Sequence, residues 1–494
     1  MPEPARLALL FGLGALLSGL TILEGINPHD EGIVLQAAAR VADGQLPYRD
    51  FYANYGPGQY YVVGALDAVF GPSLIAWRVV RVALDALVGV LAYALVRREA
   101  PEPFALGAWV AVVAVMAHPT LPHPNAAALA LAFGALLLAR RSPAGAGVLA
   151  GLAFAFRFDL GAAAAVGAAL AASGRAAAIR SAAAAAVTAG VLMVPFVIAA
   201  PGDLWDQTVG FALDEQSLQR LPLPGSYDGG LEPNRILSFY LPYVLMGGLA
   251  LWLVIAAATR TPLRLWAAFP LALAGLGYLL ARADEFHLVP LAAVLPVLLA
   301  GEAARGWLAG RRPVAVALAL PVVLVAVHGL DTNRIELVSG PPLDRIRLDV
   351  ADGVRAPREE ARSLEELVHY VRERVPPGRP VFVANPRHDL VRAGNPLVYV
   401  LAGRPNPTRY DVMQPGVVTT DEVQREIVRD LRRSPTGLVV RWLSPLASEA
   451  EPNGAGRSSG VRILDREIAR TYMEVERFGD YAVLGPREPG AGAE

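Results

Sequence analysis

Residues 27–32, with the sequence NPHDEG, place two adjacent carboxylates directly after the first apolar run of the chain, Leu7 to Leu23. No small-residue cleavage site follows that run before Asn27, so we interpret it as a retained helix and not as a signal peptide. Carboxylates at a membrane boundary serve as a general base, a metal ligand or a cation site. Neighbouring residues on a helix diverge by about 100°, so only one of Asp30 and Glu31 can face a given cavity. The alternative is that Asp30 caps the helix that follows.

The composition around this stretch is that of a membrane protein. Of the 494 residues 54% are hydrophobic and 18% are charged, against about 25% charged residues in ordinary soluble domains. Charged residues are sparse before residue 330 and frequent after it, which predicts a membrane domain over 1–330 and a soluble domain over 331–494. The net charge of −1 gives no field that would recruit nucleic acid. The chain has no Cys and no Lys, which excludes disulfides, Cys nucleophiles, Schiff bases and Walker-type nucleotide binding.

Apolar runs long enough for membrane helices, about 17 to 25 residues with some shorter candidates, predict eleven transmembrane helices. They cover 7–25, 74–96, 103–118, 124–139, 143–157, 159–173, 178–200, 236–258, 264–281, 287–303 and 313–330. Arg157 and Asp159 favour two short helices over 143–173, because a charged pair at the centre of one long span would be costly.

Arginines gather in every second connector, and by the positive-inside rule those connectors and the N-terminus are cytoplasmic. They are Arg97-Arg98, Arg140-Arg141, Arg175 with Arg180, Arg260 with Arg264, and Arg305 with Arg311-Arg312. The long connectors 26–73 and 201–235 and the C-terminal domain are then extracytoplasmic. This orientation places the polar side chains of the connector 26–73 and of the helix ends at 157–159 and 282–287 on the outer side.

The first outer connector predicts a short helix over Gly32 to Gly44, lying on the membrane surface, with a solvated loop as the alternative. It continues into an aromatic segment that contains Tyr48, Arg49 and Asp50. Aromatic faces and guanidinium groups suit a sugar or a phosphate, although an interfacial aromatic belt would have the same composition.

Further charges lie at predicted helix ends. Arg282, Asp284 and His287 stand together, and we interpret them as functional because charges in spans mark a pathway or site. Arg157 and Asp159 lie at another outer end. For Arg81 and Asp85, four residues apart, we favour a structural pair.

From Asp331 onward, short β-rich runs at 381–384, 437–442 and 481–484 alternate with helical stretches at 357–374, 420–433 and 461–478. This alternation predicts a small α/β domain with a largely parallel sheet and no catalytic groups of its own. Residues 451–460 and the tail after Pro486 are expected to be flexible.

With these motifs together, the chain resembles the GT-C fold of membrane glycosyltransferases, such as protein O-mannosyltransferases and aminoarabinose transferases. The matching features are Asp30-Glu31-Gly32, the segment Pro47-Tyr48-Arg49-Asp50-Phe51, Pro57-Gly58, and Arg282-x-Asp284-x-x-His287. The stretch from Leu401 to Tyr410 is also similar to uncharacterised bacterial members.

The resemblance implies a bacterial plasma-membrane enzyme that moves a sugar from a polyprenyl-phosphate donor to a glycan, lipid or protein acceptor. Asp30, beside Glu31, matches the position of the catalytic base, and transfer would invert the anomeric centre. The lipid phosphate would be bound by Arg282, Arg157, Arg220 or Arg49, with Asp284, His287, Asp159, Tyr48 and Asp50 nearby. A divalent metal on Asp30 and Glu31 is compatible with this scheme but not required by it. The sugar and the acceptor stay open.

Two other functions fit the same residues. A transporter or lipid flippase would also carry intramembrane charges, although no repeat is visible. A non-catalytic assembly partner in envelope biosynthesis would use the C-terminal domain for binding and would not need Asp30.

Overall fold

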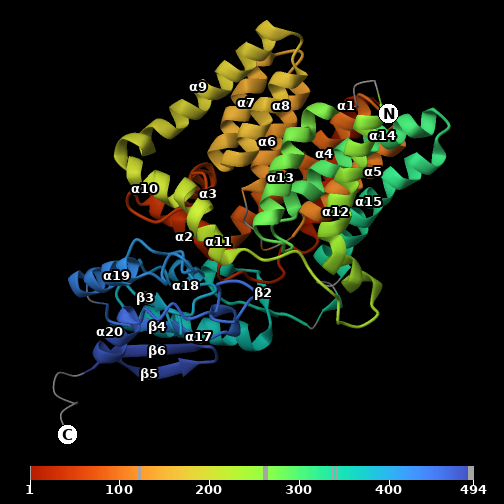
Figure 1. Cartoon of the computed structure of the whole chain (residues 1–494). Coiled ribbons are helices and arrows are strands. Elements are labelled where there is room, and N and C mark those ends of the chain that lie inside the picture. The colour runs from red at the N-terminus through yellow and green to blue at the C-terminus, as the bar shows by residue number, and fades with distance from the viewer. Residues whose placement is uncertain are drawn as a thin grey trace.

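A computed structural model describes residues 2–118, 120, 124–259, 265–335, 339–340, 342–434 and 436–487, without the side chains of 214–217. It shows a helical bundle above a smaller C-terminal region of helices and strands, which we define as residues 342–487 (Figure 1).

Helices form at all eleven predicted positions, because long apolar stretches with few Gly or Pro interruptions favour helix over other structures in lipid. They are α1 (Glu3–Gly19), α4 (Leu74–Arg97), α5 (Glu102–Met116), α6 (Asn125–Leu138), α7 (Pro143–Phe156), α8 (Phe158–Ala171), α9 (Arg175–Ala199), α12 (Pro233–Ala258), η2 with α13 (Trp266–Ala268 and Phe269–Ala281), α14 (Val289–Leu308) and α15 (Arg312–Leu330). Within the described part of the chain, five helices are long and apolar enough to cross a membrane: α4, α9, α12, α14 and α15 with its extension to Ile335. The number eleven for the spans stays a prediction.

The predicted break within 143–173 is present. α7 ends at Phe156, Arg157 is extended with φ −141° and ψ 112°, and α8 begins at Phe158. The two helices pack closely, since a Cβ added to Gly161 would lie 2.2 Å from the Phe154 Cα. Arg157 is therefore at a helix end, where its side chain can leave the apolar layer.

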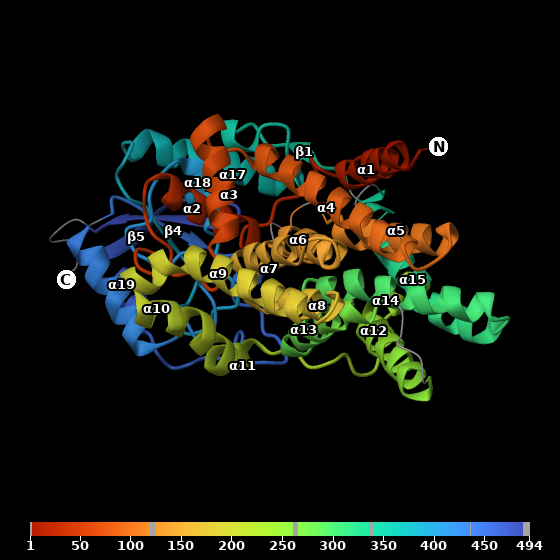
Figure 2. The same ribbon diagram turned by 90° about the horizontal axis from the view of Figure 1, so that it is seen from above.

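The connector 26–73 folds into two helices, α2 (Asp30–Ala42) and α3 (Gly58–Phe70). The predicted helix over 32–44 exists, and other parts of the protein bury most of α2, including Arg40; its place on the membrane surface stays a prediction. α2 packs against α3 on one side and against α18 (Leu397–Ala402) on the other. Figure 1 and Figure 2 both show α2 beside α18.

Gly32 explains how α2 and α18 approach so closely. A Cβ added at Gly32 would lie 2.4 Å from the Leu397 backbone nitrogen. Across the same contact, Arg40 pairs with Asp411 through Nε and Oδ2 at 2.6 Å, and its Nη2 donates to the Thr408 carbonyl at 2.6 Å. The last residue of the motif Asp30-Glu31-Gly32 is therefore a glycine because the backbone of α18 leaves no room for a side chain there.

The second long connector crosses beneath the bundle as α10 (Pro201–Trp205), η1 (Asp206–Glu215) and α11 (Gln216–Gln219). In Figure 1 it continues α9 toward the C-terminal region. Gln207 anchors it by accepting from Ala53 N at 2.9 Å and donating to the Tyr48 carbonyl at 3.0 Å.

The C-terminal region has a four-stranded sheet in the order β3-β4-β6-β5, covered by α17 (Arg358–Arg374), α18, α19 (Asp421–Arg433) and α20 (Ile463–Thr471). The strands are β3 (Phe382–Ala384), β4 (Val439–Trp442), β5 (Tyr472–Phe478) and β6 (Tyr481–Pro486). The smaller elements before α17 are η3 (Asp331–Ile335), β1 (Asp344–Arg345), η4 (Asp349–Ala351) and β2 (Arg355–Ala356), and η5 (Pro445–Ala447) follows β4.

The expectation of a largely parallel sheet is wrong. Only β3 and β4 are parallel, whereas β4–β6 and β5–β6 are antiparallel. The reason is that residues 472–478 form strand β5, whereas the sequence predicted that they continue the helix over 461–478. The helix ends at Thr471, and the chain turns through Gly479, with φ 52°, into a hairpin with β6.

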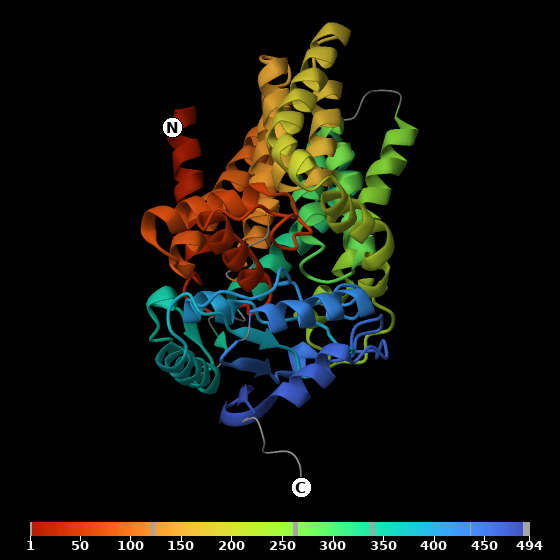
Figure 3. The ribbon, with the colours of Figure 1, turned by 90° about the vertical axis from the view of Figure 1, so that its left-hand side faces the viewer.

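The bundle and the C-terminal region lie at opposite ends of the molecule (Figure 3). Two of the arginine-rich connectors meet at the far end, where Arg98 Nη1 donates to the Leu137 carbonyl at 2.7 Å. Arg260 and Arg264 lie outside the described residues. The sidedness deduced from the arginines stays a prediction.

Candidate active site

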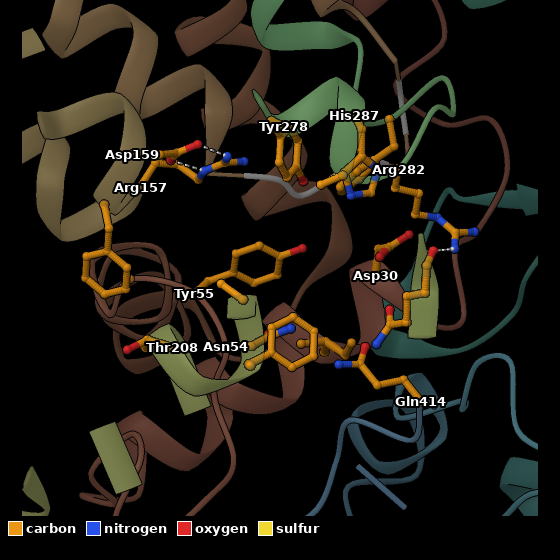
Figure 4. A pocket seen from close by; sticks show the side chains of 18 of the residues that line it. Asp30, Asn54, Tyr55, Arg157, Asp159, Thr208, Tyr278, Arg282, His287 and Gln414 are labelled. Atoms are coloured by element: carbon orange, nitrogen blue, oxygen red, sulfur yellow. Dashed lines mark hydrogen bonds and ion pairs between the residues drawn. The ribbon is translucent and has the colours of Figure 1, made fainter. Parts of the chain in front are cut away.

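A cavity of about 1280 Å³ lies between the bundle and the C-terminal region. Its walls come from the connector 26–73, the α7–α8 junction, α9 to α11, the turn after α13 and the C-terminal region. The polar lining residues that matter below are Asp30, Asn54, Tyr55, Arg157, Asp159, Tyr278, Arg282, Asp284, His287, Arg392, Gln414 and Glu451 (Figure 4).

Asp30 is the first residue of α2 and lines this cavity. At the start of the helix, Asn27 Oδ1 accepts hydrogen bonds from two backbone N–H groups, those of Asp30 at 2.8 Å and of His29 at 3.2 Å. Asn27 Nδ2 in turn donates to Asp30 Oδ2 at 3.1 Å. The capping role considered for Asp30 is therefore taken by Asn27, and the Asp30 carboxylate is turned to the cavity.

Glu31 does not share this position, so its placement in the site is wrong. Its side chain is fully buried and pairs with Arg78, with Nε to Oε1 and Nη2 to Oε2 both at 2.8 Å. Trp77 Nε1 donates to Oε1 as well, at 3.1 Å. The 100° between neighbouring helix positions sends Glu31 toward α4 while Asp30 faces the cavity.

The burial of Glu31 also argues against a metal ion bound jointly by Asp30 and Glu31. Both Glu31 oxygens already accept from Arg78, so the pair does not form a ligand set. Among the described residues, no group of three or more His, Asp or Glu side chains is arranged to hold a metal ion. We therefore derive no step through a metal.

Arg157 forms a second polar group on the opposite wall. It donates to Asp159 from Nε at 2.9 Å and from Nη2 at 2.5 Å, and to Asn125 Oδ1 at 3.0 Å. Its guanidinium carbon lies 4.0 Å from the centre of the Tyr278 ring, within the range of a cation–π contact.

Tyr55 is held beside this group by its neighbour Gly56. A Cβ at Gly56 would lie 2.3 Å from the Ala155 carbonyl oxygen, so only glycine allows the loop to approach the end of α7. Figure 4 shows the hydroxyl ends of Tyr55 and Tyr278 facing the same part of the cavity. Burial raises the pKa of Tyr55 to about 12, so the phenol stays a neutral hydrogen-bonding group.

Arg282 is the third group, and carboxylates surround it. Its Nε donates to Asp284 Oδ2 at 2.6 Å, and Nη1 and Nη2 donate to the two oxygens of Glu451 at 2.9 and 2.7 Å. Asp284 also accepts from His287 Nδ1 at 2.6 Å. Burial would raise the pKa of Asp284, but the His287 hydrogen bond and the Arg282 charge lower it below its ordinary value.

A smaller cavity of about 330 Å³ meets the large one at Asp30. Asn27, Asp30, Asp284 and Phe286 line both cavities. The other polar residues of the small cavity are His118, Glu285, His328, Thr332 and Asn333. Asp30 thus stands where two compartments join.

No protein-family model and no curated protein matches the sequence. Solved structures do match. ArnT from Cupriavidus metallidurans bound to undecaprenyl phosphate aligns with a TM-score of 0.55 and 14% identity over 100% of both chains. Its apo state aligns at 0.54 and 14% over 98% of both chains. The archaeal oligosaccharyltransferase AglB from Archaeoglobus fulgidus, in complex with an inhibitory peptide and a dolichol-phosphate, aligns at 0.50 and 11% over 100% of this chain and 75% of its own. ArnT and AglB are GT-C proteins.

The chain has the GT-C fold.

Besides Glu31, four residues predicted for the site lie outside the cavity of this GT-C chain. Arg49 and Asp50 pair with each other at 2.7 Å near the surface, because their side chains point away from the connector's packed face. Arg220 is exposed beyond α11. Tyr48 is buried with φ 71° and donates its hydroxyl to the Tyr55 carbonyl at 2.7 Å, so it supports Tyr55 from behind.

Residues of the C-terminal region also line the GT-C cavity, which the sequence reasoning missed. They include Arg392, Gln414, Trp442 and Glu451. Glu451 begins the stretch that was expected to be flexible, yet it pairs with Arg282 and Arg392, and Gly454 N donates to the Leu218 carbonyl at 2.8 Å. No sequence spacing links these residues to Asp30. Tyr278 was missed too; it lies in the last turn of α13, and Arg282 follows that helix with an extended backbone.

Proposed function

We propose that the chain is a multi-pass membrane glycosyltransferase that moves a sugar from a polyprenyl-phosphate-linked donor to an acceptor hydroxyl. The observation that carries the proposal is the position of the Asp30 carboxylate, at the junction of two cavities and opposite two cationic groups. ArnT was solved bound to undecaprenyl phosphate and AglB in complex with a dolichol-phosphate, and both share the fold.

The large cavity suits such a donor because one side of it is apolar. Residues of α9, α10 and η1 line that side, namely Met193, Val197, Leu204, Trp205 and Val209. An isoprenoid chain can lie along them, since apolar surface gains free energy when it leaves water. The phosphate then reaches the polar end near Arg157 and Arg282.

In the proposed reaction, Asp30 accepts the proton of the acceptor hydroxyl while that oxygen attacks the anomeric carbon. The bond from the anomeric carbon to the phosphate oxygen breaks, the lipid phosphate leaves with the electron pair, and the anomeric configuration inverts. Arg282, Arg157 and the hydroxyls of Tyr55 and Tyr278 are placed to stabilise the charge that grows on the phosphate. Asn27 orients the carboxylate through its amide.

The proposal includes a place in the cell. Residues 1–330 form the membrane domain and residues 331–494 an extracytoplasmic domain, with the N-terminus in the cytoplasm of a bacterium. The cavity then opens on the outer face of the plasma membrane, where a lipid-linked sugar and a glycan, lipid or protein acceptor can meet.

The test is sugar transfer by the purified full-length protein in lipid nanodiscs, with a radiolabelled polyprenyl-phosphate sugar. Release of sugar from the lipid phosphate by the wild-type protein, and its loss in Asp30→Asn, is the expected result. A flippase would move the labelled lipid across vesicles with the bond intact, and a binding partner would leave both lipid and sugar unchanged; either result overturns the proposal.

A further inference from the structure

Glu451 lies in the part of the cavity where an anionic ligand would be bound. Its two oxygens accept from Nη1 and Nη2 of Arg282, a parallel fork of the kind that guanidinium forms with carboxylates and phosphates alike. Oε1 also accepts from Arg392 Nε at 2.8 Å, and Oε2 from Asn453 Nδ2 at 2.9 Å. Two guanidiniums and one amide therefore converge on a single carboxylate.

Each of these donor residues also has a hydrogen bond to a group other than Glu451. Arg282 is also held by Asp284 on Nε and by the Gln219 carbonyl on Nη1, at 2.9 Å. The Arg392 backbone is fixed by its N–H, which donates to the Ala447 carbonyl at 2.9 Å. Asn453 is fixed as well, because its Nδ2 donates to the Gln219 carbonyl at 3.0 Å.

Rotation of the Glu451 side chain alone would free this group of donors, because its backbone lies on the cavity wall. The Glu451 carboxylate is nearly buried, with 9% of its side chain exposed. It occupies the Nη1 and Nη2 atoms of Arg282, and both residues line the cavity. Two oxygens of a phosphate can accept the same pair of hydrogen bonds from a guanidinium as a carboxylate does, and the lipid phosphate monoester that leaves after transfer carries more charge than a carboxylate.

We propose that Glu451 is a built-in competitor for the donor phosphate, and that Arg282, Arg392 and Asn453 form the phosphate-binding group once it moves aside. This inference rests on the proposed function, which it deepens by assigning residues of the C-terminal region to the donor site. The C-terminal region thereby sets how tightly the lipid phosphate is bound. Release of the lipid phosphate after transfer is helped by the return of Glu451.

The test is binding of undecaprenyl phosphate to the full-length protein in nanodiscs, by titration. Glu451→Gln keeps the shape of the side chain and removes its charge, so the lipid phosphate should bind on the order of tenfold more tightly. Glu451→Asp keeps the charge on a shorter side chain, so its affinity for undecaprenyl phosphate should lie between those of Glu451→Gln and wild type. The gain should vanish in the double variant with Arg282→Gln.

The matched control is Glu449→Gln. Glu449 belongs to the same loop and contacts Arg392 Nη1 at 2.8 Å, but it is 60% exposed and does not reach Arg282. The affinity of the Glu449→Gln variant for undecaprenyl phosphate should stay within about twofold of wild type, because exposed ion pairs contribute little. Inorganic phosphate, added as a competitor, separates recognition of the anion from recognition of the lipid tail.

Each outcome decides something. Unchanged or weaker binding by a folded Glu451→Gln variant overturns the inference, because Glu451 would then only position Arg282. If wild type transfers sugar in the same preparations, the proposed function survives that result. If wild type neither binds the lipid phosphate nor transfers sugar, both fall together. Tighter binding by Glu451→Gln, together with no sugar transfer by the wild type, keeps the inference as an anion site and rejects the enzyme.

Discussion

Arg78 donates from Nε and Nη2 to the two carboxylate oxygens of Glu31, each at 2.8 Å, and neither side chain is exposed. Arg78 also donates to the carbonyls of Ile22 and Gly25, at 2.9 and 2.8 Å. One ion pair therefore holds α4, the end of the first apolar segment and the start of α2 together. Asp30 is positioned by a neighbour that has no part in the cavity.

Glu31→Gln should destabilise the protein, because it leaves the Arg78 charge buried without its partner. Loss of one member of a buried pair costs roughly 3–5 kcal/mol. The measurement is the melting temperature of the purified protein. Asp352→Asn, which breaks the exposed pair with Arg345, is the control and should melt like wild type. Equal melting of both variants would contradict the role given to Glu31.

Asp30→Asn should lower turnover on the order of 10²–10⁴-fold, the usual loss of a general base. The melting temperature should change little for Asp30→Asn and for Asp30→Ala, because Asn27 accepts from the N–H groups at the start of α2. Asp50→Asn, outside the cavity, should keep its activity. A fully active Asp30→Asn variant would end the proposal for this residue.

Gly32→Ala should separate α2 from α18, because the new Cβ would lie 2.4 Å from the Leu397 nitrogen. Overpacking of this kind costs about 1–3 kcal/mol and shifts the backbone. Limited proteolysis between the bundle and the C-terminal region should become faster. Gly12→Ala, with nothing within 4 Å of the added Cβ, is the control; identical digestion of the two variants would count against the contact.

The C-terminal region should be accessible from outside the cell. Glu373, with 75% of its side chain exposed on α17, can be replaced by Cys in a chain that has no native Cys. An impermeant thiol reagent should label Glu373→Cys in intact cells and Arg141→Cys only after lysis. The reverse pattern would invert the topology and move the proposed site to the cytoplasm.

Glu467 should make the stability of the C-terminal region depend on acidic pH. A hydrogen bond and the charge of Arg432, with further contacts from Arg470, lower the pKa of Glu467 to about 2. Because the folded pKa lies below the unfolded value of about 4.3, this stabilisation is present above pH 4.3 and is lost as the pH falls toward 2. Melting of wild type and Glu467→Gln should therefore differ at pH 7, differ less at pH 3 and converge only as the pH falls to about 2. Glu373→Gln controls for the loss of one charge.

The helices could be predicted because their signals are local. Apolar length and the charges at Arg157 and Asp159 fixed the bundle segments and the break between α7 and α8 within a few residues. β5 was missed because residues 472–478 continue the polar composition of α20, and only pairing with β6 makes them a strand.

The site was predictable only in part, since its contacts join distant parts of the chain. Asp30, Arg157, Arg282, Asp284 and His287 line the cavity as expected from the sequence. Nothing near Glu31 in the sequence reveals Arg78, 47 residues away. Glu451 reaches Arg282 across 169 residues, so its place in the cavity follows from tertiary packing alone.

The contact between Arg40 and Asp411 sets an order of events during biosynthesis. The two residues are 371 positions apart, and at about 5–20 residues per second a ribosome needs roughly 20 to 70 s to go from one to the other. During that interval α2 has been made, but the part of the C-terminal region against which it packs, including α18, has not. Asp30 therefore cannot yet be held in its final place. A truncated or stalled chain would therefore insert its first helices with the cavity incomplete, and the proposed transfer could begin only after the last third of the protein has been translated and docked.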